Sequence, residues 1–170
     1  MRTAKVIAMQ IRPASLQADA DSIWAILEPT IRAGETYTLP AEMTRKDALD
    51  YWFAPRHQVF AAEEGSQVLG TYFLQPNQQG GGSHVANCGY VTATWATGRG
   101  VARAMCVHSL HTARERGFRA MQFNFVVSSN QRAVALWQSF GFEIVGRLPG
   151  AFQHPTAGFV DAFVMYRSLV

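Results

Sequence analysis

The spacing of apolar residues alternates along the chain between the two-residue period of a β-strand and the 3.6-residue period of a helix. Strands are expected at seven places, which are residues 5–11, 57–63, 67–74, 85–94, 120–127, 142–147 and 161–168. Helices are expected from residue 21, over 44–52, over 99–116 and over 130–140. This order of about seven strands and about four helices predicts a mixed α/β fold built on one central sheet.

Residues with strong positional preferences mark the ends of several elements. Asp21 and Ser22 are expected to begin the first helix, and Thr44 to cap the second. Gly117 is expected to end the third helix. Residues 76–84 contain three consecutive glycines, which predicts a hairpin tip without a role in the site.

The length and composition fit one domain. The chain has 170 residues, of which 48% are apolar and 12% aromatic, and this balance excludes disordered, collagen-like and coiled-coil chains. We therefore expect a single domain over residues 1–170. No apolar run reaches the roughly 18 residues of a membrane span, and the first residues lack a signal-peptide pattern. A cytoplasmic protein without a membrane partner is expected.

Cysteine usage supports the same expectation. Cys88 lies in a strand-like run and Cys106 in a helical one, and both are expected to be small, buried hydrophobic residues. Two cysteines do not make a disulfide scaffold. No group of Cys and His residues has the spacing of zinc ligands, so no metal site is expected.

The net charge of +3 is unevenly distributed along the sequence. Residues 1–98 carry a net charge of −2, residues 99–132 carry +5, and residues 133–170 are neutral overall. A short arginine-rich segment in a near-neutral chain indicates a local anion site. It is too compact and too poor in lysine for a nucleic-acid track, so no nucleic-acid partner is expected.

The most informative segment is Thr97-Gly98-Arg99-Gly100-Val101-Ala102, which lies between a predicted strand and the third predicted helix. Its glycines allow a tight turn and bring backbone N–H groups close to a ligand. The first amides of a helix lack intrahelical partners and the helix dipole is positive at this end, so a diphosphate fits there. Arg99 and Arg103 can add charge-assisted contacts. The segment lacks the third glycine of a dinucleotide fingerprint and the Gly-Lys-Ser/Thr ending of a triphosphate loop.

A second motif follows the strand at 120–127 and reads Asn130-x-x-Ala133-x-x-Leu136-Trp137-x-x-Phe140-Gly141-Phe142. With both motifs in this order, the chain resembles the GNAT N-acetyltransferase superfamily. The first motif corresponds there to the acetyl-CoA pyrophosphate loop, Arg/Gln-x-x-Gly-x-Gly/Ala. The second corresponds to Asn-x-x-Ala-x-x-Leu-Tyr-x-x-x-Gly-Phe. The resemblance is strongest over residues 88–147, and the order of the predicted elements extends it over the whole chain.

The resemblance implies a GNAT fold, acetyl-CoA as the cofactor and acetyl transfer to an amine. In this fold two parallel strands, here 85–94 and 120–127, are splayed so that the acetyl thioester sits in the gap between them. The backbone of Tyr90, Val91 and Thr92 would pair with the pantetheine arm, and Asn130 would hydrogen-bond the cofactor nearby. The diphosphate would bind the loop formed by Thr97, Gly98, Arg99, Gly100, Val101 and Ala102.

Three positions depart from the family pattern. Thr97 stands where Arg or Gln is preferred, which removes a side-chain contact but leaves the backbone amides. Trp137 replaces the Tyr that protonates the leaving thiolate in many members, and because an indole N–H is no practical acid, Trp137 is expected to serve packing. Phe125 stands where some members place a catalytic Glu. The general acid and base of this chain therefore stay open.

Polar amides interrupt the two apolar strands at the expected gap. Asn124 and Gln122 alternate onto one face of one strand, and Asn87 lies in the other. Buried amides are costly unless they find partners. Two interpretations stay open: the amides satisfy the backbone, water or each other, or Asn87 and Asn124 act in catalysis by holding the acceptor or an ordered water. Chemistry would then rely on the proximity of amine and thioester, with backbone N–H groups of residues 90–92 polarising the carbonyl.

The acceptor pocket is expected from residues 29–56, where family members build a variable wall. Glu35, Tyr37 and Trp52 are the expected substrate-binding residues, because acids attract a cationic amine and aromatic rings enclose it. The C-terminal run over 154–166 is similar to the tails of phosphinothricin and proline-analogue acetyltransferases. That likeness implies an amino acid or an analogue as the acceptor, and a homodimer.

The leading interpretation is an acetyl-CoA-dependent N-acetyltransferase in which a small-molecule amine attacks directly within a ternary complex. A protein N-terminus or lysine is an alternative acceptor, but it needs an open groove, whereas three consecutive aromatic residues at 51–53 indicate a closed pocket. A non-catalytic acyl-CoA-binding sensor is a further alternative, because the usual acid and base are missing.

Overall fold

The structure is a computed structural model that describes residues 8–170. Within this range seven strands form one sheet, and they are β1 (Gln10–Pro13), β2 (Gln58–Glu64), β3 (Gln67–Pro76), β4 (Val85–Thr92), β5 (Ala120–Val127), β6 (Glu143–His154) and β7 (Gly158–Ser168). Four α-helices of the same described residues accompany the sheet, and they are α1 (Leu16–Ala33), α2 (Arg45–Trp52), α3 (Val101–Glu115) and α4 (Gln131–Ser139). The mixed α/β architecture predicted from the sequence is confirmed.

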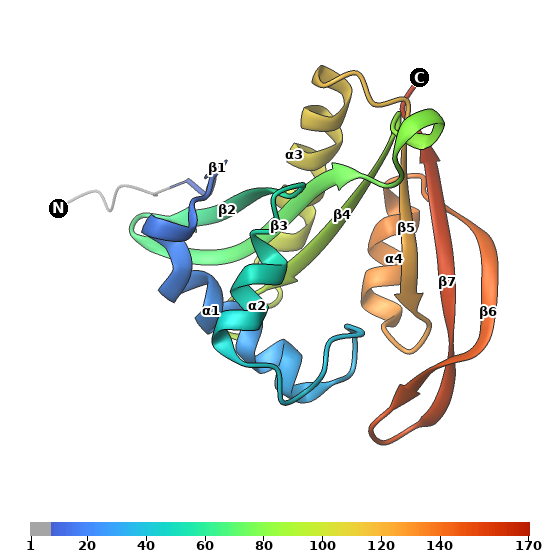
Figure 1. Cartoon of the computed structure of the whole chain (residues 1–170), viewed down its shortest axis with the longest axis horizontal. Helices are drawn as coiled ribbons and strands as arrows, with labels where there is room; N and C mark the ends of the chain where they lie inside the picture. Colours follow the sequence, from blue (N-terminus) through green and yellow to red (C-terminus); the bar gives the residue numbers. More distant parts are fainter. Residues whose placement is uncertain (1–7) are drawn as a thin grey trace, which may run out of the picture.

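The strand order is β1-β2-β3-β4-β5-β7-β6, and every neighbouring pair is antiparallel except β4 and β5. These two strands are parallel because α3 carries the chain back between them. Their pairing is short: only Val85↔Ala120 and Ala86↔Met121 are in register. Beyond that point the two strands diverge, as Figure 1 shows. The predicted splay of two parallel strands is therefore present.

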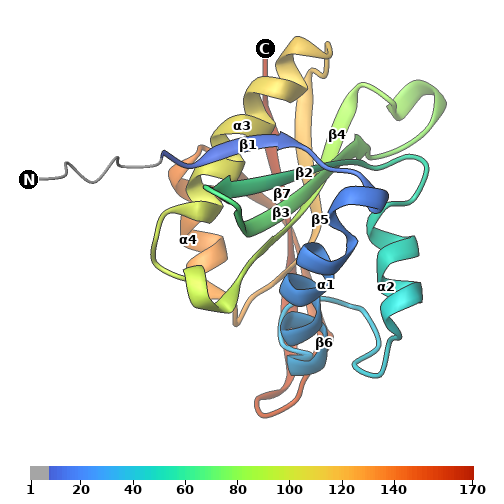
Figure 2. The ribbon, with the colours of Figure 1, turned by 90° about the vertical axis from the view of Figure 1, so that its left-hand side faces the viewer.

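The helices cover both faces of the sheet, with α1 and α2 on one face and α3 and α4 on the other (Figure 2). Their apolar stripes explain this arrangement. Ile23, Ile26, Leu27 and Ile31 of α1 are all buried. On the opposite face α3 buries the stripe of Met105, Cys106, Leu110 and Ala113.

Several element boundaries differ from the sequence expectation. Helix α1 begins at Leu16 rather than Asp21, because Ser15 caps it by accepting a hydrogen bond from the N–H of Ala18. The extra first turn begins with the exposed residues Leu16, Gln17 and Ala18, so the buried apolar period that begins at Ile23 gave no sign of it. The expected strand at 5–11 lies partly outside the described residues, and β1 runs from Gln10 to Pro13.

The last two strands are longer than expected. β6 extends to His154 rather than 147, and β7 begins at Gly158 rather than 161. Most side chains of β6 are exposed, so they lack the alternation that reveals a strand. The expected cap of the second helix is confirmed, since Thr44 accepts a hydrogen bond from the N–H of Asp47 at the start of α2.

One glycine sets how closely α3 approaches the sheet. A Cβ atom on Gly70 of β3 would lie 2.7 Å from Val101 Cγ1 and 3.0 Å from Met105 Cε. Val101 is the first residue of α3, so this contact fixes the height of the helix start above β3 and β4. A side chain at position 70 would therefore have to displace Val101 and Met105 of α3.

Gly70→Ala should therefore destabilise the protein by about 1–3 kcal/mol, the usual cost of overpacking a core. Gly81→Ala is a matched control, because a Cβ at Gly81 meets no atom within 4 Å. Urea unfolding followed by circular dichroism would measure both. Equal midpoints for the two variants would show that α3 moves at little cost.

Candidate active site

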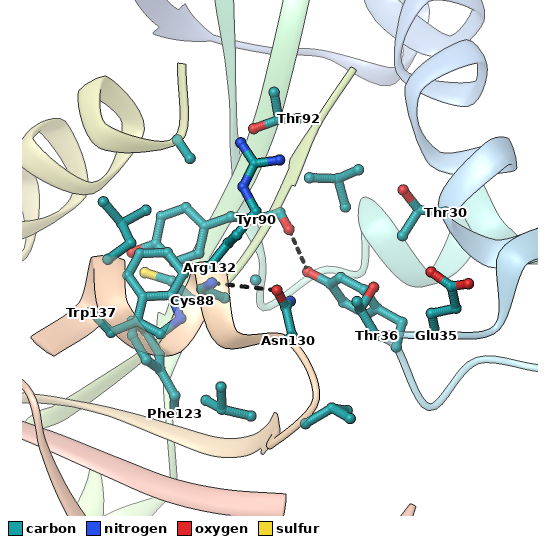
Figure 3. A pocket seen from close by; sticks show the side chains of 18 of the residues that line it. Thr30, Glu35, Thr36, Cys88, Tyr90, Thr92, Phe123, Asn130, Arg132 and Trp137 are labelled. Atoms are coloured by element: carbon teal, nitrogen blue, oxygen red, sulfur yellow. Dashed lines mark hydrogen bonds between the residues drawn. The ribbon is translucent and has the colours of Figure 1, made fainter. Parts of the chain in front are cut away.

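A cavity of about 1000 Å³ lies between the diverging strands β4 and β5 (Figure 3). Its walls come from α1 and the loop that follows it, from α2, β3, β4 and β5, and from the first turns of α3 and α4. The cavity exists because the sheet opens where these two strands separate. Elements from both faces of the sheet therefore reach one continuous space.

The alternation of side chains along β4 divides the cavity into two sides. Tyr90 points toward α3 and α4: its hydroxyl lies 2.7 Å from Ser109 Oγ, and its ring centroid lies 4.9 Å from that of Trp137. Gly89 faces the opposite side, where a Cβ atom would lie 3.1 Å from the hydroxyl of Tyr37. We call these the α3 side and the α1 side of the cavity.

The α3 side contains an exposed helix start. Gly98 and Gly100 have φ angles of +82° and +79°, which glycine adopts without strain. Gly100 is the N-cap of α3 and provides no side-chain hydrogen bond to the first helical amides. A Cβ atom at either glycine would meet nothing within 4 Å, so the space above the loop is open. This geometry has the features expected of an anion site, namely unpaired helical amides facing open space.

The loop residues do not all reach the cavity. Those that line it are Thr97, Gly98, Gly100, Val101 and Ala102. Arg99 is a correction, because it turns away and its guanidinium donates to Glu64 Oε2 at 2.5 Å. The Arg99 guanidinium is thus paired with a carboxylate that lies outside the lining of the cavity.

Two other arginines supply positive charge. Arg103 lines the cavity, donates to Ser139 Oγ at 3.3 Å, and lies 5.0 Å from the ring centroid of Phe140. Arg132 lies in the first turn of α4 and also lines the cavity (Figure 3). The sequence did not single out Arg132, although it belongs to the arginine-rich segment and stands two residues after Asn130.

Asn130 lines the cavity beside Arg132 and also begins α4. Its Oδ1 accepts a hydrogen bond of 3.3 Å from the N–H of Ala133, which fixes the carboxamide. The Nδ2 group keeps its donor capacity for another partner. Trp137 is 8% exposed and packs between Tyr90 and Phe123, so its predicted packing role is confirmed.

The backbone of β4 presents one free edge to the cavity. The Tyr90 carbonyl accepts a hydrogen bond of 2.9 Å from the hydroxyl of Tyr37, so this carbonyl points into the gap. Val91 pairs with Thr71 of β3, and the N–H of Ala93 donates to Leu69 of β3. Tyr90 and Thr92 therefore face the gap with their backbone groups, and Val91 faces the neighbouring strand.

Carboxamides form the floor of the α1 side, where Gln75, Asn87 and Asn124 line the cavity. Gln122 and Asn77 lie outside the lining and hydrogen-bond to Asn124. Asn87 Nδ2 donates to the carbonyl of Gln122 at 2.9 Å. Asn124 accepts from Gln122 Nε2 at 2.9 Å and donates to Asn77 Oδ1 at 2.6 Å. Asn87 and Asn124 both line the cavity as expected, with partners that satisfy part of their capacity.

The upper wall of the α1 side is aromatic. Tyr37, Tyr51 and Phe73 line it. Trp52 is a correction: it is 0% exposed, and its indole N–H donates to Thr71 Oγ1 at 3.0 Å. In a helix two neighbouring residues face different directions, so Tyr51 takes the wall position that we assigned to Trp52.

The titratable groups of the cavity are few. Among residues 8–170, Glu35 is the only carboxylate that lines it. Burial raises the pKa of the Tyr37 and Tyr51 phenols and of the Cys88 thiol, so all three are protonated near neutral pH. Phe125 contributes an apolar ring where a base was conceivable. Residues 8–170 contain no cluster of three or more His, Cys, Asp or Glu residues that could hold a metal ion.

A sheet that opens between two parallel strands beside a glycine-rich helix start defines an acetyltransferase of the GNAT type. The chain belongs to the acetyltransferase (GNAT) family, whose model matches residues 21–142. It is similar to the N-acetyltransferase aca1 of Schizosaccharomyces pombe, with 26% identity over 151 residues that cover 79% of this chain and 72% of that protein.

Solved structures agree with this assignment. A GCN5-related N-acetyltransferase from Kribbella flavida is 41% identical, with a TM-score of 0.90 over 95% of this chain and 98% of the other. The structure of yncA from Salmonella typhimurium with its cofactor acetyl-CoA is 20% identical, with a TM-score of 0.82 over 96% and 95% of the two chains. At that identity the second likeness shows the fold alone.

The assignment of the helix start can be tested by Gly100→Glu. The carboxylate would occupy the open space above the loop and repel phosphates, so acetyl-CoA affinity should fall at least ~100-fold. Gly100→Ala is the control, because it carries the same backbone strain without the charge. Calorimetric titration would measure both, with circular dichroism to check folding. Equal affinities in the two folded variants would remove the loop from the phosphate site.

Proposed function

We propose that the protein transfers the acetyl group of acetyl-CoA to the amine of a small molecule, an amino acid or an analogue being favoured, in a ternary complex. One observation carries this proposal: a single cavity joins the exposed start of α3 to the polar and aromatic wall of the α1 side. Donor and acceptor can therefore be bound together and meet in the gap between β4 and β5. Direct attack of the amine needs this simultaneous occupancy.

Acetyl-CoA is the cofactor of this family, as expected from the sequence. The residues present fit it, because the loop around Gly98 and Gly100 leaves open space above unpaired helical amides. Arg103 and Arg132 would neutralise phosphate charge. The free backbone edge at Tyr90 and Thr92, with Asn130 across the gap, would hold the pantetheine arm. When bound, acetyl-CoA supplies a thioester whose carbonyl carbon is the electrophile.

The α1 side would take the acceptor. Glu35 lies in the loop after α1, where it would attract a cationic amine. Tyr37, Tyr51 and Phe73 would enclose the apolar part of a small molecule, and this enclosure favours a small acceptor over a protein chain. Asn87 and Asn124 would hold the acceptor through their remaining hydrogen-bonding capacity.

Proton transfer would depend on solvent rather than on a dedicated base. Phe125 and Trp137 carry no group that titrates near neutral pH, and the buried phenols of Tyr37 and Tyr51 are too weakly acidic to protonate a thiolate. The amine would attack in its neutral form, so that a C–N bond forms as the C–S bond of the thioester breaks. The amine would release its proton to water, and the departing thiolate would take a proton from water or from the reacting amine. Rate enhancement would come from proximity and from the backbone N–H groups on the free edge of β4.

A thiol-release assay with free amino acids, amino-acid analogues, polyamines and N-terminal peptides tests the proposal. We expect release with a small amine, and Glu35→Gln should raise the KM for that amine roughly fivefold while the KM for acetyl-CoA stays unchanged. Glu42→Gln is a matched control, since Glu42 lies nearby in the sequence but does not line the cavity. Release with peptides alone would favour a protein acceptor. Acetyl-CoA binding without release would favour a sensor.

We also propose a homodimer that forms through β6. This strand is the last in the sheet, so its outer edge is available for pairing. It exposes three apolar side chains, Ile144, Val145 and Leu148. Exposed apolar groups along an unpaired strand edge favour association with a second copy.

Val145→Lys should convert such a dimer to a monomer, because a lysine on an edge strand opposes pairing. Val170→Lys is the control, since Val170 is also exposed but lies at the C-terminus, outside the strands. Light scattering after size-exclusion chromatography gives the mass of each. A monomeric parent protein, or a dimeric Val145→Lys variant, would contradict the proposal.

A cytoplasmic location is proposed on the state of the cysteines. Cys88 and Cys106 are free and buried, and burial raises the pKa of both thiols, that of Cys106 to about 12. Such protonated, unpaired thiols suit a reducing compartment. Within the described part of the chain, no helix is long and apolar enough to cross a membrane.

A further inference from the structure

One hydrogen bond connects the two sides of the cavity. Tyr37, in the loop between α1 and α2, donates its hydroxyl to the backbone carbonyl of Tyr90 at 2.9 Å. The Tyr37 ring also packs edge-on against the buried Trp52, with centroids 6.3 Å apart. Burial raises the pKa of the Tyr37 phenol, so the group is a neutral donor. A residue of the proposed acceptor wall is thus attached to the strand proposed to hold the donor.

The contact depends on a glycine beside it. A Cβ atom on Gly89 would lie 3.1 Å from the Tyr37 hydroxyl and 2.6 Å from Phe73 Cε1. Any other residue at position 89 would therefore displace Tyr37 or Phe73. The absence of a side chain there lets the phenol lie against the backbone of β4, at the point where the strand turns its free edge to the gap.

The Tyr90 carbonyl is also placed to accept a hydrogen bond from a ligand that pairs with the edge of β4. A ligand that pairs with a strand edge uses the carbonyl and N–H groups that point away from the sheet. On β4 these belong to Tyr90 and Thr92, because Val91 and Ala93 are bonded to β3. The Tyr37 hydroxyl therefore already occupies one hydrogen-bonding position on the edge of β4 along which a pantetheine arm would pair.

We propose that Tyr37 is a positioning residue that couples donor binding to the shape of the acceptor pocket. When acetyl-CoA is bound along β4, the Tyr90 carbonyl accepts a hydrogen bond from the cofactor in place of the one from Tyr37. The Tyr37 hydroxyl is then free, and the loop after α1 moves away from β4. The acceptor side then reaches its working shape only after the donor is bound. This inference rests on the proposed binding of acetyl-CoA along β4.

The surroundings of the loop confine the movement to a few residues. Gly34 begins the loop in the left-handed conformation, with φ +63°, at the end of α1. The far end is held by Arg32, whose guanidinium donates to the carbonyls of Ala41 and Met43 at 2.5 and 2.9 Å. Residues 35–40 lie between these two anchors, where Tyr37 is hydrogen-bonded to β4 and Leu39 packs against the core.

Hydrogen exchange of the backbone amides tests the coupling without knowledge of the acceptor. In the parent protein, saturating acetyl-CoA should accelerate exchange over residues 35–40 at least ~5-fold, because the Tyr37 hydrogen bond is lost. In Tyr37→Phe these amides should already exchange fast and should not respond to acetyl-CoA. Acetyl-CoA should also bind this variant roughly 2- to 10-fold more tightly, since no hydroxyl has to be displaced.

Tyr51→Phe is the matched control. It removes a phenolic hydroxyl from the same wall, but from a residue in α2 rather than in the loop. It should respond to acetyl-CoA as the parent protein does, and thermal melting should show all three proteins folded. A loop that ignores acetyl-CoA in the parent, or responds equally in Tyr37→Phe, would overturn the coupling. Failure of the parent protein to bind acetyl-CoA at all would instead overturn the proposed function.

Discussion

The separation of β4 from β5 after two residues of pairing is the constraint on which the site depends. A parallel pair that continued would leave no cavity, no free strand edge and no meeting point for two ligands. Asn87 stabilises the point of separation, because its side chain donates to the Gln122 carbonyl just beyond the last paired residues, Ala86 and Met121. A side-chain amide there replaces the next backbone hydrogen bond and ends the ladder without leaving that carbonyl unpaired.

The electrostatic character of the site follows from how the two faces of the sheet are covered. On the α3 side, unpaired helical amides combine with Arg103 and Arg132 to make a region suited to phosphate. On the α1 side, Glu35 provides the only carboxylate among the described lining residues, above a floor of neutral carboxamides. In Figure 3, Arg132 and Glu35 lie on opposite sides of Asn130. The separation of charge across one cavity suits an anionic donor and a basic acceptor.

The sequence was sufficient for the fold and for the glycine-rich start of α3, because both depend on local signals. Apolar periods fixed the order of elements, and the two glycines before α3 adopt the positive φ angles that only glycine takes easily. Arg99 and Trp52 were misplaced for a different reason. The direction of a side chain depended on tertiary partners, Glu64 for Arg99 and Thr71 for Trp52, which are 35 and 19 residues away. The extension of β6 beyond residue 147 was missed because its exposed side chains carry no burial pattern.

Strand β4 therefore positions groups on both sides of the cavity and in the gap between them. Its side chains reach alternately into the α3 side, where Tyr90 packs on Trp137, and toward the α1 side, where Gly89 makes room for Tyr37. Its backbone edge points into the gap between them. Two ligands aligned on the same strand would be held in register with each other, because the strand fixes both positions at once. In the proposed reaction such alignment would contribute to the rate without a dedicated acid or base, because the reacting groups are already held together.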